Sequence, residues 1–164
     1  MVNCERCGHF KVCERAKNHI IYLKNGKLSF SDSDCKFYIE GKKEPIAKVE
    51  IPLKLPSLNE YTGACRENKY KGARMKKDIE NNIAVFLKKL PRFDKPVAID
   101  FHWIEENKRR DLDNICSAKK FILDALVKLG KLKDDNRKCV YAFKDTFGYG
   151  LTAKVILSFY EKEG

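Results

Sequence analysis

The chain has 164 residues, enough for one ordinary domain and a small additional module, and 43% of them are hydrophobic, which excludes a disordered chain. Its formal net charge is +11, with a pI near 9.3, so we expect a polyanionic partner such as nucleic acid; a merely soluble, basic protein is the alternative. No apolar run approaches the roughly 18 residues of a membrane span. Residues 1–20 carry cysteines and charges where a signal peptide needs an apolar block, which predicts a cytoplasmic location without a membrane partner.

The first 41 residues are rich in cysteine. Four of the chain's seven cysteines lie there: Cys4, Cys7, Cys13 and Cys35. The first two form a C-x-x-C pair followed by glycine, a spacing typical of a zinc knuckle, and the other two would complete a four-cysteine site. His9 is the alternative ligand, and a disulfide or free thiols are the alternative states. We therefore predict a zinc-binding module over residues 1–41, folded around its metal.

A polar segment ending in proline, residues 41–45, precedes a second predicted domain over residues 46–164. Alternating apolar and polar residues predict a first strand over 47–53. That regularity breaks over 55–61, a segment that contains Asn59 and whose plainest interpretation is a turn.

The next stretch is strongly basic. Its cations are Arg66, Lys69, Lys71, Arg74, Lys76 and Lys77. They predict a surface that contacts nucleic-acid phosphates, which supplies affinity without sequence specificity. A solvated helix start is the alternative. Apolar residues at helical spacing then predict a helix over 79–90, stopped by Pro91, and a second strand follows over 97–104.

The densest charge lies in residues 108–135. There, the basic triplet Lys108-Arg109-Arg110 runs into Asp111-Leu112-Asp113-Asn114, a helix follows, and a second acidic pair, Asp134-Asp135, comes after it. Unpaired charges are costly to bury, so this density suits a site where a hard metal ion meets phosphate oxygens rather than a core.

Helical geometry orders the residues of this stretch. Asp113 and Asn114 are typical helix-starting residues, and Gly130 is a typical stop. At about 100° per residue, Ser117, Lys120 and Asp124 fall on the side of Asp113, opposite an apolar face. Side chains two apart in an extended segment point the same way, so Asp111 can converge with Asp113. Asp134-Asp135 can approach them only if the next strand pairs beside the one that ends near Arg110.

Strands over 139–144 and 151–159, separated by a turn at 148–150, complete the element order β-α-β-α-β-β. This predicts a two-layer α/β (α+β) domain in which two helices cover one face of a mixed sheet.

The residues of 108–135 resemble the RusA family of Holliday-junction resolvases, small endonucleases of phages and prophages. The shared pattern is a basic run, Asp-x-Asp-Asn, a helix with Lys120 followed by Asp124-Ala125-Leu126, a glycine turn and an Asp-Asp pair. One departure is an extra stretch of about three residues near the helix start, which leaves Lys119 as an alternative to Lys120.

The resemblance implies Mg²⁺-dependent (or Mn²⁺-dependent) hydrolysis of DNA phosphodiesters. Asp111, Asp113 and Asp135 would bind the ion, with Asp134 as the alternative to Asp135, and Lys120 would stabilise developing negative charge. The other expected DNA contacts are Arg109 and Arg110, through phosphates, and Asn59, near the active site. The resemblance also implies a homodimer that resolves four-way junctions in a phage-encoded recombination or repair setting.

Two other functions are compatible with these residues. One is a non-enzymatic, zinc-stabilised nucleic-acid-binding protein, in which the aspartates are helix caps and ion-pair partners. The other is a nuclease that acts on forks, flaps or RNA.

Overall fold

The computed structural model describes residues 44–162, and the second of the chain's two compact units begins at Pro45. The predicted zinc ligands Cys4, Cys7, Cys13 and Cys35 and the alternative ligand His9 lie outside the described residues. The zinc module therefore stays a prediction.

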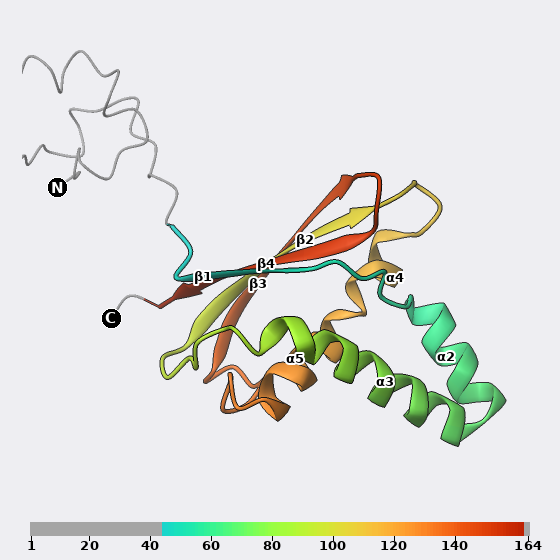
Figure 1. Cartoon of the computed structure of the whole chain (residues 1–164), viewed down its shortest axis with the longest axis horizontal. Coiled ribbons are helices and arrows are strands. Elements are labelled where there is room, and N and C mark those ends of the chain that lie inside the picture. The colour runs from blue at the N-terminus through green and yellow to red at the C-terminus, as the bar shows by residue number, and fades with distance from the viewer. Residues whose placement is uncertain (1–43, 163–164) are drawn as a thin grey trace, which may run out of the picture. The chain divides into compact units, whose positions relative to one another are not determined.

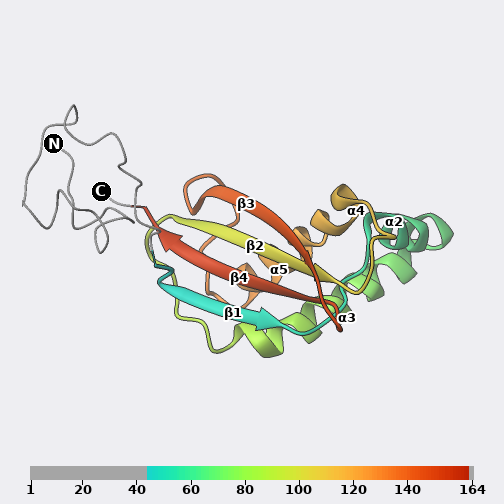
Figure 2. The ribbon, with the colours of Figure 1, turned by 90° about the horizontal axis from the view of Figure 1, so that it is seen from above.

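Four strands form one mixed sheet in the order β1-β4-β2-β3. They are β1 (Ala47–Ile51), β2 (Val97–Glu105), β3 (Val140–Tyr149) and β4 (Lys154–Glu161). β2 and β3 run parallel, whereas β4 pairs antiparallel with both β1 and β2. Figure 2 looks onto this sheet with its long helices behind it. The mixed α+β class predicted from the sequence is confirmed.

The helices are α2 (Leu58–Glu67), α3 (Lys69–Leu87), α4 (Leu112–Cys116) and α5 (Lys119–Lys128). α3 and α5 lie on the same side of the sheet (Figure 1). The predicted element order holds at this level, with two differences. The helix predicted over 79–90 begins earlier, at Lys69, and is preceded by a further helix, α2, whereas the helix predicted after Asp113 is divided into α4 and α5.

The first of these differences arises at Ser57. Ser57 caps α2: its hydroxyl accepts a hydrogen bond from the Glu60 backbone N–H, and the Glu60 carboxylate accepts one from the Ser57 backbone N–H. This reciprocal capping box satisfies two N–H groups that a helix start otherwise leaves unpaired. Most of the segment expected to be a turn is therefore helical. Asn68, which is extended (φ −159°), then separates α2 from α3.

The second difference lies at Ser117 and Ala118, between α4 and α5. Hydrogen bonds here span three residues: Ala118 N–H donates to Ile115, and Lys120 N–H donates to Ser117. Such a tight turn advances about 120° per residue instead of about 100°, so the backbone is wound more tightly between Asp113 and Lys120 than in one continuous α-helix. The expected shared stripe of Asp113 and Lys120 stays a prediction.

The core lies between one face of the sheet and the helices. The inward residues of β2 are all buried, and Phe101 and Phe159 are among the largest side chains with no appreciable exposure. Helices α3 and α5 contribute Leu87 and Leu126 to the same cluster. Burial of each such side chain contributes about 1.5–3 kcal/mol, so this one apolar layer dominates the stability of the domain. The apolar face predicted for the helix after Asp113 is confirmed.

In residues 44–162, no helix is long and apolar enough to cross a membrane.

A close contact between α2 and α3 depends on Gly72. A Cβ atom at this position would stand 2.4 Å from the Cys65 sulfur and 3.1 Å from the Cys65 Cα, whereas a Cβ at Gly63 of α2 would meet nothing within 4 Å. Both glycines are helical, so the gain in helix propensity from alanine is similar at both. In urea titrations, we expect the free energy of unfolding of Gly72→Ala to be about 1–2 kcal/mol lower than that of Gly63→Ala. Equal free energies for the two variants would contradict this packing.

Candidate functional site

Strand β2 and helix α4 are joined by a clamp centred on Arg110. Its Nη1 donates to both Glu105 carboxylate oxygens, at 3.1 and 3.2 Å, and its Nη2 donates to the Leu55 carbonyl at 2.9 Å. Only 17% of the Arg110 side chain is exposed, and a second carboxylate, that of Glu60, lies 3.7 Å away. The guanidinium expected to hold a phosphate thus has protein partners on two of its nitrogens.

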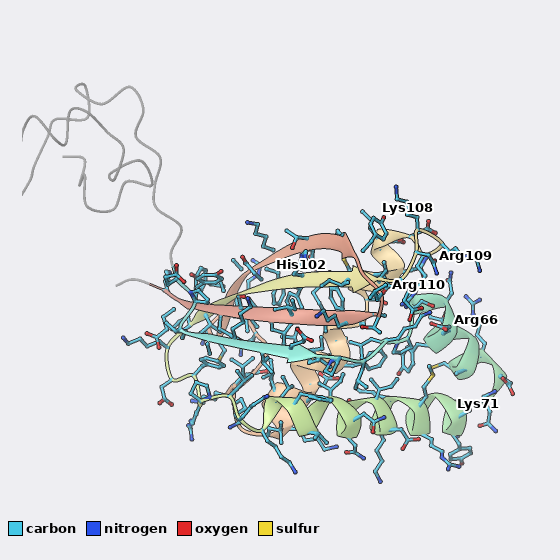
Figure 3. The ribbon with its side chains drawn as sticks, turned by 45° about the horizontal axis from the view of Figure 1, so that its top comes forward. Arg66, Lys71, His102, Lys108, Arg109 and Arg110 are labelled. Carbon is cyan, nitrogen blue, oxygen red and sulfur yellow. The ribbon has the colours of Figure 1, made fainter. Side chains whose placement is uncertain are left out.

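Lys108 and Arg109 differ from Arg110, because both are exposed. Neither pairs with a carboxylate of residues 44–162. Figure 3 shows both at the end of the domain that also carries Arg66 and Lys71. Helix α2, which carries Arg66, contacts α4, the helix that follows Arg109. This end of the domain therefore presents cations that remain available to an external anion.

Asp111 and Asp113 stand at the start of α4. Asp111 is the extended N-cap residue, Asp113 lies in the first helical turn, and both side chains are exposed. Neither forms an ion pair within residues 44–162. The side-chain oxygen of the adjacent Asn114 is buried without a hydrogen-bond partner. Asp-x-Asp-Asn therefore offers oxygen donors that no protein group satisfies, which is unusual for a buried amide oxygen.

Lys120 organises a second cluster, between α5 and the loop before β3. Its ammonium lies 2.7 Å from Asp124 and 2.8 Å from Asp135, and Lys76 of α3 lies 2.6 Å from Asp124. Hydrogen bonds to the two carboxylates, first Asp124 and then Asp135, raise the pKa of Lys120 above its usual range. The Lys120 hydrogen bond lowers the pKa of Asp135. Burial tends to raise the pKa of Asp124, but its hydrogen bonds with Lys120 and Lys76 outweigh that and lower it.

This cluster sits in a groove between α3 and α5. Its charged lining comprises Lys76, Lys77, Glu80, Lys120, Asp124, Lys128 and Asp135. Glu80 is buried, with the ammonium groups of Lys76 and Lys128 each 3.6 Å from it. Cations and carboxylates thus largely neutralise one another here, unlike at the end of the domain that carries Lys108 and Arg109.

The direction of β3 determines how the two acidic clusters relate. The expected condition is met, since β3 pairs directly beside β2. The pairing is parallel, however, so β3 starts opposite Val97, at the end of β2 far from the one that leads to Asp111. In the described part of the chain, no three His, Cys, Asp or Glu side chains gather in a way that could hold a metal ion. Convergence of Asp111, Asp113 and Asp135 therefore stays a prediction.

The other acidic candidate, Asp134, serves its own loop. Its carboxylate accepts hydrogen bonds from the Asp135 backbone N–H, at 2.7 Å, and from the Asn136 side-chain amide, at 2.6 Å. These bonds leave the adjacent Asp135 carboxylate facing Lys120.

Asp145 and Lys119 form a pair that sequence reasoning missed. Lys119 Nζ lies 2.6 Å from one Asp145 oxygen, and the Trp103 indole N–H donates to the other at 2.9 Å. Burial, followed by the charge of Asp145, raises the pKa of the nearby Cys116 thiol. Alternation in sequence predicted the strand only as far as Lys144, so Asp145 carried no signal. The pairing separates the two lysine candidates: Lys119 contacts Asp145, and Lys120 contacts Asp135.

The predicted basic stretch does not form a single face. Lys76 and Lys77 line the groove between α3 and α5, whereas Lys71 and Arg74 line another groove, with Lys54, beside the start of α2. Lys71 pairs with Glu67 at 2.5 Å and Arg74 with Asp78 at 3.8 Å, both on exposed side chains where such pairs contribute little.

The remaining predicted contacts are exposed. Arg66 lies in the last turn of α2, and the Lys69 ammonium lies 5.1 Å from the centre of the Tyr70 ring. Asn59 lies in the first turn of α2, where its carbonyl accepts a hydrogen bond from the Thr62 hydroxyl. The expected position of Asn59 near the acidic residues stays a prediction.

No known family model matches this chain, and no curated protein matches it either. The function must therefore be inferred from the residues and contacts of the chain itself.

Replacement of Arg110 tests the clamp. Arg110→Ala leaves the Glu105 carboxylate, 12% exposed, without its partner, so we expect the free energy of unfolding to fall by about 2–4 kcal/mol in urea titrations. Arg109→Ala removes a neighbouring exposed arginine that pairs with no carboxylate of the described residues. We expect it to change the free energy of unfolding by less than about 0.5 kcal/mol. Equal effects of the two substitutions would show that the clamp contributes nothing.

The Lys120 cluster predicts a pH dependence. Because the pKa of Asp135 is lowered in the folded state, its contribution to stability is present above the unfolded pKa of about 4 and is lost as pH falls through the folded value. Lys120→Met should raise the Asp135 pKa towards its usual value, measured by carboxyl ¹³C NMR. Lys133→Met, which removes an exposed lysine from the same loop, should leave it unchanged; an unchanged value in both variants would contradict the pairing.

Proposed function

We propose that this protein is a metal-dependent endodeoxyribonuclease that hydrolyses phosphodiester bonds of branched DNA, in the manner of RusA-like Holliday-junction resolvases. The supporting observation is the end of the domain where β2 leads into α4. Exposed carboxylates and exposed cations stand there side by side, and neither kind is neutralised by the described protein. A polyanion bound together with a divalent cation would pair with both kinds of charge.

The chemistry of the donors fits a divalent cation such as Mg²⁺. Asp111, Asp113 and the unpartnered oxygen of Asn114 are hard oxygen donors, which Mg²⁺ and Mn²⁺ prefer. Asp111 and Asp113 would hold the ion, and Asp135 is the third candidate. When bound, the ion would supply an activated water and neutralise charge on the phosphate.

The chain's own cations have separate roles in this proposal. Arg109 and Lys108 would hold phosphates beside the acidic residues, whereas Arg110 positions the start of α4 through Glu105. Lys120 would contribute its positive charge near the reacting phosphate. This requires that the Asp135 carboxylate leave Lys120, which it contacts here, and bind the metal instead. Arg66, Lys69 and Lys77 would extend the electrostatic surface over α2 and α3.

Further parts of the proposal rest on the family resemblance. A homodimer would place two such sites on opposing strands of a four-way junction, because a two-fold axis matches paired nicks. The N-terminal cysteines would bind structural zinc. The setting would be the cytoplasm of a bacterial host that carries the phage or prophage gene.

A second function is favoured by one contact. Lys120 already neutralises Asp135, and no set of three metal ligands gathers in residues 44–162. A nucleic-acid-binding protein without cleavage activity would retain this arrangement permanently. In that case Asp111 would act as a helix-start residue and Lys108 and Arg109 as phosphate contacts.

Substitution of Asp113 separates the two functions. We expect Asp113→Asn to reduce Mg²⁺-dependent nicking of a synthetic four-way junction by about 100-fold or more, because one ionised oxygen donor near the phosphate is lost. Junction affinity should stay the same or rise, since a negative charge next to the DNA is removed. Nicking is read on denaturing gels, and affinity by mobility shift in Ca²⁺.

The matched control is Asp94→Asn, which changes an exposed aspartate that pairs with Arg92 away from α4. It should nick at the wild-type rate. Wild-type protein that binds the junction but never nicks it in Mg²⁺ or Mn²⁺ would leave the binding function in place of the nuclease.

A further inference from the structure

Tyr149 occupies a distinctive place at the end of β3. It pairs in register with Glu105, the last residue of β2, and 58% of it is exposed. The ammonium of Lys108 lies 5.4 Å from the centre of its ring. A large aromatic ring is thus displayed at the end of the domain that carries the unpaired cations, where burial gives it no role in the core.

The position of the ring is well defined by the strand. The backbone N–H of Gly150 donates to the Glu105 carbonyl at 3.0 Å, which closes the end of the β2–β3 ladder. A Cβ at Gly150 would stand 2.9 Å from the Ile104 side chain, so a larger residue here would require that side chain to shift. Tyr149 is therefore presented from a fixed backbone rather than from a loose loop.

Glu105 connects this ring to the acidic residues. Its backbone neighbours Tyr149 in the sheet, and its carboxylate holds Arg110, the residue directly before Asp111. The ring, Lys108, Arg109 and Asp111 are thus brought to one end of the sheet by a chain of direct contacts. Two further apolar side chains are exposed near the ends of these elements, Leu112 at 52% and Leu151 at 99%.

We propose that Tyr149 is a stacking platform for an unpaired or splayed base of the DNA held beside Asp111 and Asp113. Every base has an aromatic face that can stack on a tyrosine ring, and each base is followed by a phosphate that Lys108 and Arg109 can neutralise. In space, the aromatic ring is followed by cations, and this order matches the alternation of base and phosphate along single-stranded DNA. This proposal rests on the proposed function, and it assigns the preference of the nuclease for branched DNA to one residue, Tyr149.

Charge favours this occupant over an apolar protein surface. An apolar protein partner would bury Lys108 and Arg109 without pairing them, which is costly, whereas a nucleic acid pairs both. Duplex DNA keeps its bases stacked inside the helix, so the ring gains a base only where pairing is interrupted. Tyr149 should therefore distinguish branched from linear DNA, in contrast to the phosphate contacts.

The test compares full-length wild-type protein with Tyr149→Ala, Tyr149→Leu and Tyr149→Phe. The control is Tyr141→Ala, which removes a 41%-exposed tyrosine near the other end of β3. Affinity is measured in Ca²⁺ for a four-way junction and for a linear duplex of the same length. We expect Ala and Leu to weaken junction binding about tenfold, with Phe and the Tyr141 control near wild type, and duplex binding unchanged in all variants.

A second readout locates the contact. A junction carrying 5-iodouracil at the branch point is irradiated in the complex, and the cross-linked peptide is identified by mass spectrometry. We expect the cross-link on Tyr149, its loss in Tyr149→Ala and its retention in the Tyr141 control. Far-UV circular dichroism and thermal unfolding establish that each variant is folded. Because Leu retains apolar bulk without an aromatic ring, it shows the same loss only if stacking is responsible.

The outcomes separate the two proposals. Tyr149→Ala and Tyr149→Leu with wild-type junction affinity and no cross-link at residue 149 would overturn the stacking platform, while nicking abolished by Asp113→Asn would keep the nuclease. A change of oligomeric state in Tyr149→Ala, with junction affinity per dimer unchanged, would make the ring an interface between copies and also overturn the platform. Wild-type protein that binds junction and duplex equally would overturn it as well.

Discussion

The ion pair of Arg110 with Glu105 is the interaction on which the geometry of this end of the domain depends. It ties three segments together: the last residue of β2, the residue before Asp111 and, through the Leu55 carbonyl, the approach to α2. A half-buried guanidinium must satisfy most of its donors, so its partners define the path of all three segments. The exposed charges around it are positioned by this one buried contact.

Two arrangements of charge coexist on the domain. In the groove between α3 and α5, Lys120, Asp124 and Asp135 neutralise one another through short contacts that shift their pKa values in opposite directions. At the end of β2, Lys108 and Arg109 stand beside Asp111 and Asp113 without such pairing in the described part of the chain. Paired charges stabilise the fold modestly, whereas unpaired charges are free to act on a ligand. The proposed nuclease and its stacking residue are both placed at the second location for this reason.

Much of the fold was predictable because local patterns carry it. Strand patterns predicted the existence of all four strands, but β3 continues to Tyr149, into the turn expected at 148–150, and β4 begins only at Lys154. The apolar face of Ile122, Ala125 and Leu126 is buried as expected. Gly130 stops the helix with a positive φ of 67°, a conformation that favours glycine. The start of α2 also has a signal in the sequence, the Ser-x-x-Glu pattern of its capping box. The neighbouring turn-forming residues favoured the prediction of a turn instead.

The sequence by itself determined the classes of residue available, a surplus of cations and two acidic pairs, whereas the strand end that carries Tyr149 was expected to be a turn. Only the tertiary structure decided which charges are paired, because ion pairing depends on strand direction and helix phase, which no local pattern contains. Because β3 runs parallel to β2, it begins at the end of β2 far from Asp111, and Asp135, in the loop before β3, pairs with Lys120. Arg110 became an internal clamp for the same reason: Glu105 and Leu55, which receive it, are adjacent only once the sheet and α2 have folded together.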